Sequence, residues 1–215
     1  MQVPDNYYAD KQYLLSLLSP QRYDKAKRIK HQKSFYYCTL AELLLKKALG
    51  VLPDSKIEYY HNQNGKPYLV NHDMFFNLSH TDGYILCATD SHTPLGVDVQ
   101  AHKQHIDFEK IAKRWFHNND WQKISDQKSI GLFYDMWTAK ESIVKCDGCG
   151  IQNNFSDFYL EKSQNGFKAT INSTLYNTVS LNIASHVSAS LAINNSCLKE
   201  NTDICLINVD PKSLL

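Results

Sequence analysis

The sequence predicts an α+β fold made of two similar halves, which we place at residues 1–102 and 103–215. Residues 19–49 have the apolar spacing of a helix, and residues 57–100 contain short strands separated by turn signals. Helical spacing returns over residues 108–146, and further short strands follow. Because this order of elements occurs twice, we expect two halves related by duplication, with a ligand cleft between them.

Local signals define the individual elements. Ser19 and Pro20 are typical of a helix start, and Gly50 is typical of a helix end. Residues 77–88 and 182–192 share a pattern of strand, polar turn and strand, which supports the duplication. We expect a loop at 62–67 and strands at 57–60, 75–78, 84–89, 95–99, 155–160, 167–171, 180–185 and 189–194.

The composition argues against several classes of protein. The 215 residues carry a formal net charge of +1, so no overall positive field draws the chain to nucleic acid or to an anionic membrane. The N-terminus does not read as a secretory signal, and no apolar run is long enough to span a bilayer. The six cysteines read as reduced thiols, and Cys146 and Cys149 lack the second ligand pair of a zinc site. We therefore expect a cytoplasmic protein.

The segment from Leu95 to Gln100 is the first candidate for chemistry. In a strand, Asp98 and Gln100 project to one face, and Val97 and Val99 project to the other. A carboxylate beside a second oxygen ligand suits magnesium, which takes few carboxylates together with waters and phosphates. The alternative is an edge strand with a solvated polar face.

The second candidate is the helical segment from Trp137 to Lys145. Glu141 and Lys145 are four residues apart and share one face of the helix. Glu141 would act as a metal ligand or base, and Lys145 would contact phosphate. The alternative is a surface ion pair of little energetic value.

Two polar corners complete the set of candidates. Ser79 and His80 end a predicted strand, where His80 can donate to a phosphate oxygen or to a turn carbonyl. The surroundings of Ser79 lack a nucleophile-elbow pattern, which argues against serine catalysis. Gly65, Lys66 and Pro67 form a turn that either contacts a nucleotide or is a solvated hairpin.

Taken in order, four motifs resemble the 4'-phosphopantetheinyl transferase superfamily, and its Sfp type most closely. They are Gly65-Lys66-Pro67, Phe76-Asn77-Leu78-Ser79-His80, Gly96-Val97-Asp98-Val99 and Trp137-Thr138-Ala139-Lys140-Glu141-Ser142-Ile143-Val144-Lys145. The resemblance runs from about Ser19 to Ile151. It implies a monomer of two pseudo-twofold α+β halves, with coenzyme A in the cleft and magnesium, or manganese in its place, on the diphosphate.

The resemblance also assigns roles to residues. It makes Asp98, Glu141 and Gln100 the metal ligands, and Asp98, Glu141 and Lys145 the catalytic residues. Gln100 stands where many Sfp-type sequences have glutamate. The implied coenzyme A contacts are Lys66, Pro67, Ser79, His80 and Lys140, with Arg22, Lys25 and Arg28 as candidates for the 3'-phosphate, because Tyr37 stands near the place of the family's basic residue.

The implied function is transfer of phosphopantetheine from coenzyme A to a serine of an acyl or peptidyl carrier protein, with release of 3',5'-ADP. We expect residues 103–128 to dock the carrier through Lys110, Lys113, Arg114, Trp121 and Lys123. One alternative is a coenzyme A or nucleotide binding module without activity. Another is a nucleic-acid binder that uses the basic residues of segment 22–33, although a solvated helix face explains that segment better.

Overall fold

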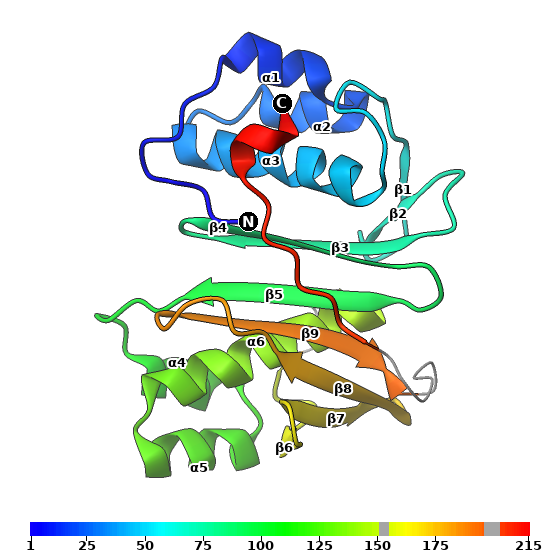
Figure 1. The fold of residues 1–215 in the computed structure, drawn as a ribbon. Coiled ribbons are helices and arrows are strands. Elements are labelled where there is room, and N and C mark those ends of the chain that lie inside the picture. The colour runs from blue at the N-terminus through cyan, green and yellow to red at the C-terminus, as the bar shows by residue number, and fades with distance from the viewer. Residues whose placement is uncertain (151–154, 196–202) are drawn as a thin grey trace.

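The structure is a computed structural model of residues 1–215, and it describes all of them except 151–154 and 196–202. Helices and strands are mixed along the chain, which confirms the predicted α+β class (Figure 1). The elements up to residue 90 are α1 (Lys11–Leu17), α2 (Pro20–Ala26), α3 (Gln32–Ala48), β1 (Tyr59–His61), β2 (Pro67–Leu69), β3 (Phe75–Thr81) and β4 (Tyr84–Asp90). After them come β5 (Leu95–Ala101), α4 (Phe108–Trp115), α5 (Asn118–Gln127), α6 (Ile130–Asp147), β6 (Glu161–Lys162), β7 (Phe167–Ile171), β8 (Thr174–Ser180), β9 (Val187–Asn194) and the 3-10 helix η2 (Pro211–Leu214).

The described strands form three antiparallel sheets. β1 pairs with β2, β3 pairs with β4, and the third sheet has the order β5-β9-β8-β7-β6. The second and third sheets meet along β3 and β5, which lie side by side in Figure 1. Side chains join them, because Asn77 Oδ1 accepts from the Val97 amide at 2.9 Å and Thr81 Oγ1 accepts from the Ala101 amide at 3.0 Å. Alternate side chains of β3 therefore hold β5 in place.

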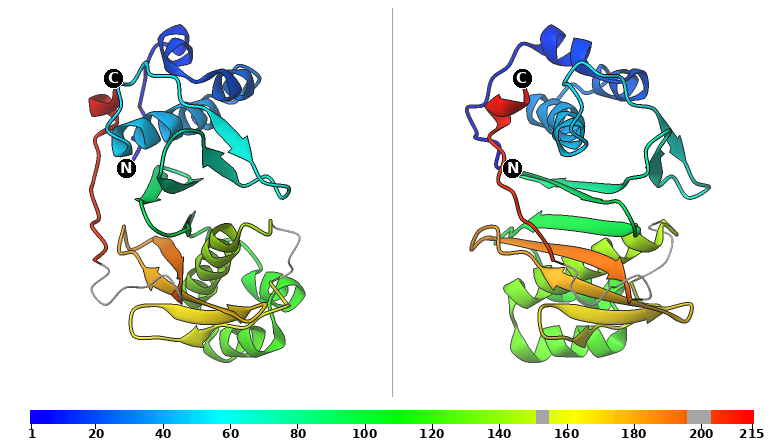
Figure 2. Two further views of the ribbon diagram at one scale, coloured as in Figure 1. Left: turned by 90° about the vertical axis from the view of Figure 1, so that its right-hand side faces the viewer. Right: turned by 45° about the vertical axis from the view of Figure 1, so that its right-hand side comes forward.

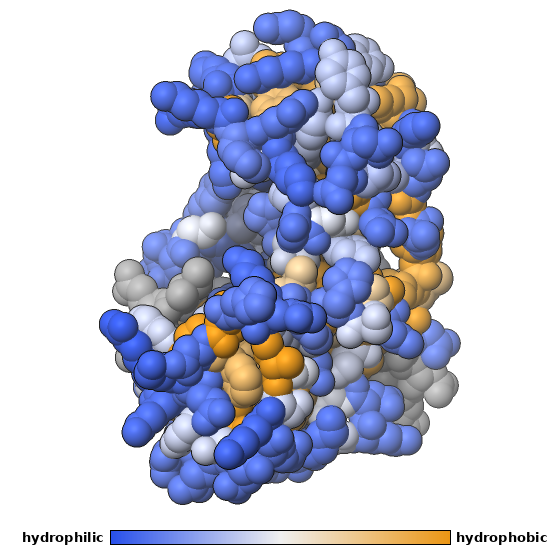
Figure 3. Space-filling view, turned by 90° about the vertical axis from the view of Figure 1, so that its left-hand side faces the viewer, coloured by the Kyte–Doolittle hydropathy of each residue, from blue (hydrophilic) through white to orange (hydrophobic). Residues whose placement is uncertain are grey.

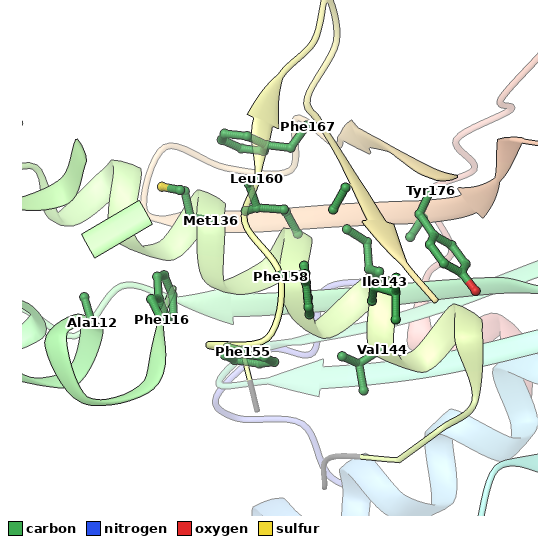
Figure 4. Close-up of a cluster of buried hydrophobic side chains, with 14 of the residues drawn as sticks. Ala112, Phe116, Met136, Ile143, Val144, Phe155, Phe158, Leu160, Phe167 and Tyr176 are labelled. Atoms are coloured by element: carbon green, nitrogen blue, oxygen red, sulfur yellow. The ribbon is translucent and has the colours of Figure 1, made fainter. Parts of the chain in front are cut away.

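One long helix packs on each of these sheets. α3 covers β3 and β4, whereas α6 lies against β5 and β9. The core beneath α6 is rich in aromatic side chains, and Figure 4 shows Phe116, Phe155, Phe158 and Phe167 gathered around it. Val97 and Val99 point into a separate apolar cluster with Tyr84, as the alternation in β5 predicts. This packing leaves the other face of β5, which carries Asp98, turned toward α6.

Several predicted elements are corrected by the structure. The helix expected over 19–49 is two helices, because α2 ends at Ala26 and His31 caps α3 by accepting from the Ser34 amide. The helical stretch over 108–146 is three helices, α4, α5 and α6. No strand covers 155–160, and the strand expected at 180–185 is wrong, because 174–180 form β8 instead. The pattern likeness of 182–192 to 77–88 therefore does not describe matching strands.

The C-terminal segment returns to the first part of the chain. From residue 203 it crosses the molecule to η2, which packs on α3 (Figures 1 and 2). Leu214 is buried in the cluster around α3, and Lys47 donates to the Ser213 carbonyl at 3.3 Å. β5 precedes residue 102, but it pairs with β9 and so belongs to the five-stranded sheet of the later strands. The chain therefore passes from the early elements to this sheet before β5, and it returns to α3 at its C-terminal end. A division into halves at residue 102 stays a prediction. Among the described residues, no helix is both long and apolar enough to cross a membrane.

The close approach of α6 to β5 requires a glycine at position 96. A Cβ atom built there would lie 2.0 Å from the Ser142 carbonyl oxygen and 2.4 Å from the Cys146 amide nitrogen. We expect Gly96→Ala to lower the free energy of unfolding by about 3 kcal/mol, because backbone atoms must move apart. Urea unfolding followed by circular dichroism measures this change.

Gly131→Ala is the matched control, because a Cβ at Gly131 would meet nothing closer than 3.7 Å. Gly131 lies in α6, so this variant should be neutral or more stable by up to about 1 kcal/mol. Equal unfolding midpoints for Gly96→Ala and the unmodified protein would contradict this prediction, because they would show that β5 and α6 can move apart at little cost in free energy.

Candidate active site

Asp98 is the centre of a hydrogen-bonded cluster between the two parts of the chain. Its side chain is buried on β5, and its Oδ1 atom accepts from Ser79 Oγ and from Lys145 Nζ, each at 2.7 Å. Lys145 Nζ also donates to Ser79 Oγ at 3.2 Å and to the Val97 carbonyl at 3.1 Å. Three predicted site residues from β3, β5 and α6 therefore meet at one point.

Glu141 faces the same point from one turn earlier on α6. Burial raises the pKa of Glu141, and the negative charge of Asp98 raises it further, while Lys145 opposes both effects. Within the described part of the chain, no hydrogen-bond donor contacts the Glu141 carboxylate. Two neighbouring carboxylates, one without a donor, form a place where a cation is favoured.

The residues present fit a magnesium ion. Mg²⁺ takes one or two carboxylates and fills its other positions with water and phosphate oxygens, so a third acidic ligand is not required. Gln100 lies beside Asp98, with its Nε2 donating to Asp98 Oδ2 at 3.3 Å. Over the described residues there is no group of three or more His, Cys, Asp or Glu side chains that could hold a metal. The site therefore offers two carboxylates and one amide.

A cavity of about 990 Å³ opens beside this cluster. Ser79 and Lys145 line it, whereas Asp98, Glu141 and Gln100 are not among the lining residues. Other predicted residues of the lining are Arg22, Lys25, Lys66, Pro67 and His80. Because four of these lining side chains are cationic, the cavity suits an elongated ligand that carries several phosphate groups.

His80 lies on the rim of the cavity and contacts Tyr37. The two rings pack edge to face, with their centroids 5.6 Å apart. The Tyr37 hydroxyl accepts from the Gly83 amide at 2.7 Å and donates to Asp82 at 3.2 Å, so the β3–β4 turn fixes the ring. Partial desolvation lowers the pKa of His80, and the charges of Lys145, Lys25 and Arg22 lower it further. The His80 imidazole is therefore neutral in a cavity whose other basic residues are positively charged.

Two of the basic lining residues are held by the protein itself. Arg22 Nε lies 3.5 Å from the carboxylate of Glu42, which is fully buried on α3 and also accepts from Ser19. Lys66 Nζ donates to the Cys146 carbonyl at 2.8 Å and to the Leu95 carbonyl at 3.4 Å. Arg22 and Lys66 therefore enter the cavity in fixed positions.

Lys140, which is predicted to contact coenzyme A, is not among the described residues that line the cavity. Lys140 is fully buried, and its ammonium forms an ion pair with Asp120 at 2.8 Å. It also donates to the carbonyls of Phe155 and Phe158 at 2.8 and 2.6 Å. Burial lowers the pKa of Lys140 to about 8 and Asp120 opposes this, so the side chain keeps its proton at neutral pH. Helical periodicity explains the difference, because Lys140 points away from the face shared by Glu141 and Lys145.

Arg28 is the other predicted residue that the structure leaves apart from the cluster. Its side chain is exposed and is not among the described residues that line the cavity. Conversely, the side chains of Asn62, Asn77 and Thr81 make contacts near the site, and sequence reasoning assigned them no role. The alternation of polar residues along β3 was a usable signal for Asn77 and Thr81, whereas the role of Asn62 depends on a contact far along the chain.

Comparisons with known proteins identify the family. The family model described as the 4'-phosphopantetheinyl transferase superfamily matches residues 94–194, the range that holds Asp98, Glu141 and Lys145. A Bacillus subtilis protein named 4'-phosphopantetheinyl transferase is 30% identical over 162 residues, which cover 71% of this chain and 70% of that protein. The chain belongs to the 4'-phosphopantetheinyl transferase superfamily.

Two further relatives of the superfamily support the predicted Sfp type. The 4'-phosphopantetheinyl transferase Sfp of Bacillus subtilis (strain 168) is 29% identical over 159 residues, covering 71% of this chain and 70% of the relative. The 4'-phosphopantetheinyl transferase gsp of Aneurinibacillus migulanus is 33% identical over 158 residues. This match covers 71% of the present chain, which spans 65% of the length of the gsp protein. The resemblance read from the four motifs is thus confirmed.

Proposed function

We propose that this chain transfers the 4'-phosphopantetheine group of coenzyme A to a serine of an apo acyl or peptidyl carrier protein and releases 3',5'-ADP. Family membership supports the reaction class. The observation that carries the proposal for this chain is the cluster of Asp98, Ser79 and Lys145 at the wall of a cavity with several basic lining residues. Such a cavity suits the diphosphate and the 3'-phosphate of coenzyme A.

Each residue of the cluster would have its own role in a single displacement reaction at the β-phosphorus of coenzyme A. The carrier serine oxygen forms a bond to the β-phosphorus, and the bond from that phosphorus to the oxygen of 3',5'-ADP breaks. Glu141 would accept the serine proton, because within the described residues no hydrogen-bond donor occupies its carboxylate. Lys145 and His80 donate to the phosphoryl oxygens as negative charge shifts toward the leaving group.

Asp98 and Glu141 would hold Mg²⁺, or Mn²⁺ in its place, with the amide oxygen of Gln100 as a neutral third ligand. When bound, the cation supplies charge neutralisation at the diphosphate and at the leaving group. Because glutamine replaces a charged ligand, the protein contributes two negative charges to this set. Ser79 and Lys145 orient the Asp98 carboxylate from its other side.

The carrier protein would dock on segment 103–128. Its basic residues include Lys110 and Lys113, and Arg114 lies over the ring of Trp115 at 5.1 Å, with Trp115 44% exposed. Figure 3 shows a largely hydrophilic face with apolar surface in its lower part, and also near its top and along its right-hand edge. Basic side chains beside apolar surface suit an acidic helical partner.

Coenzyme A binding should take up a proton at His80. The free imidazole has a lowered pKa, and a phosphate beside it favours the protonated form, so its pKa rises on binding. Affinity should therefore strengthen as the pH falls through the range between the two pKa values. Calorimetry at pH 6.5 in two buffers with different ionisation heats measures the uptake. His80→Gln should abolish it, whereas His72→Gln, at an exposed loop position, should leave it unchanged.

The proposed reaction is tested by its small product. Chromatography should detect 3',5'-ADP when the protein is mixed with coenzyme A, Mg²⁺ and an apo carrier protein. A carrier with alanine in place of its acceptor serine should give none. Binding of coenzyme A without 3',5'-ADP across several carriers would instead indicate a binding module.

A further inference from the structure

We infer that the turn between β1 and β2 is a latch that closes the cavity and makes Asn62 and Asn64 positioning residues for Lys145. The latch consists of the side chains of Asn62, Asn64 and Lys66 together with the carbonyls of Cys146 and Gly148 at the end of α6. Its effect on catalysis rests on the proposed function. Its existence as a contact does not.

Three hydrogen bonds form the latch. Asn62 Nδ2 and Asn64 Nδ2 both donate to the Gly148 carbonyl, at 3.0 and 3.1 Å, and Lys66 Nζ donates to the Cys146 carbonyl at 2.8 Å. The partners are 80 to 86 residues apart in sequence. Figure 2 shows the β1–β2 hairpin extending toward the second part of the chain, where α6 ends.

The end of a helix needs such partners. The last carbonyls of an α-helix have no amide donor within the helix, and they carry partial negative charge that a cation stabilises. Gly148 caps α6 in the left-handed conformation with φ of 78°, and its amide closes the last turn by donating to the Val144 carbonyl. Lys66 and the two asparagines therefore cap α6 from the other part of the chain.

The fit of the two surfaces is close. A Cβ atom at Gly148 would lie 3.0 Å from Lys66 Cδ and 3.3 Å from Asn62 Nδ2, and one at Gly150 would lie 3.4 Å from Asn64 Cβ. Both glycines have positive φ, which other residues rarely adopt. Two glycines thus leave the space into which the turn inserts.

The position of the latch connects it to the reaction. Asn64, Gly65 and Lys66 of the turn line the cavity, and so do Lys145 and Gly148 at the end of α6. Lys145 lies three residues before Gly148 on the last turn of α6 and reaches Asp98 from there. Holding Gly148 therefore fixes how the turn and the end of α6 meet in the cavity lining, and it fixes the last turn of α6, which carries Lys145.

The side chain of Asn62 also stabilises the turn itself. A variant that tests the latch must therefore keep its Oδ1 acceptor. Its Oδ1 atom accepts from the amides of Asn64 and Lys66 at 3.0 and 2.9 Å. Asn62→Asp keeps this acceptor and replaces the Nδ2 donor with an oxygen that faces the Gly148 carbonyl. Asn64→Ala removes the other donor, and Asn6→Ala, at an exposed position near the N-terminus, is the matched control.

The test combines hydrogen exchange with steady-state kinetics on the full chain. In the double variant Asn62→Asp and Asn64→Ala, the amides of the last turn of α6 should exchange at least about tenfold faster. The KM for coenzyme A should rise about tenfold, with kcat changed by less than about threefold. Asn6→Ala should match the unmodified protein in both measurements.

Exchange rates within twofold of the unmodified protein would overturn the latch. Faster exchange with an unchanged KM would overturn the positioning role, and so would a raised KM with unchanged exchange, which indicates direct ligand contact instead. Faster exchange in a protein whose unmodified form transfers no phosphopantetheine would support the latch and refute the proposed function.

Discussion

Asp98→Asn should lower kcat/KM for phosphopantetheine transfer by about 10²–10³-fold while the chain stays folded. Asparagine keeps the shape of the side chain and an oxygen that accepts from Ser79. It removes the negative charge that faces Lys145 at 2.7 Å and that would hold the metal beside Glu141. Kinetics with saturating apo carrier protein, together with a circular dichroism spectrum, measure both parts of this prediction.

Asp73→Asn is the control for the loss of a carboxylate, because Asp73 is exposed in the loop between β2 and β3. It should keep the activity of the unmodified protein. If Asp98→Asn retained transfer within threefold, the buried carboxylate would be a structural partner of Lys145 and not part of the active site.

Lys140→Met should lower the free energy of unfolding by about 3–5 kcal/mol. Asp120 is fully buried, and without Lys140 its remaining partners are the Leu160 amide at 3.0 Å and the Lys123 ammonium at 3.6 Å. The carbonyls of Phe155 and Phe158 would also lose their donor. Urea denaturation measures the change.

A double variant separates the charge from the packing. Lys140→Met combined with Asp120→Leu should recover at least about 1 kcal/mol of the loss, since no buried charge is left unpaired. Lys168→Met is the matched control, because Lys168 and Glu161 form an ion pair that is about half exposed and is worth less than about 1 kcal/mol. A loss below 1 kcal/mol for Lys140→Met would show that the Asp120 carboxylate is accommodated without its partner.

Helix existence could be predicted from the sequence, whereas helix breaks could not. Helical apolar spacing lies on both sides of residues 27–31 and of residues 128–129, so the sequence reads as continuous helix across both breaks. The breaks are set by local backbone groups, since His31 and Ser129 cap the helices that follow them and Lys128 adopts a left-handed conformation with φ of 46°. These signals are weak beside apolar periodicity.

The candidate site was predictable where its residues share one element. The alternation in β5 correctly places Asp98 beside Gln100, and helical spacing correctly places Glu141 and Lys145 on one face. Lys140 illustrates the limit of reading residues from a motif, because a neighbour in sequence points about 100° around the helix. The latch contact from Asn62 to Gly148 joins residues 86 apart, and no local pattern carries that information.

The central claim is that the chain modifies a carrier protein at a serine, and the mass of the carrier tests it most directly. After incubation with coenzyme A and Mg²⁺, intact-mass spectrometry of an apo carrier protein should show a gain equal to one phosphopantetheine group. The gain should disappear when the acceptor serine is replaced by alanine. An unchanged carrier mass, with coenzyme A bound to the protein by calorimetry, would contradict the claim.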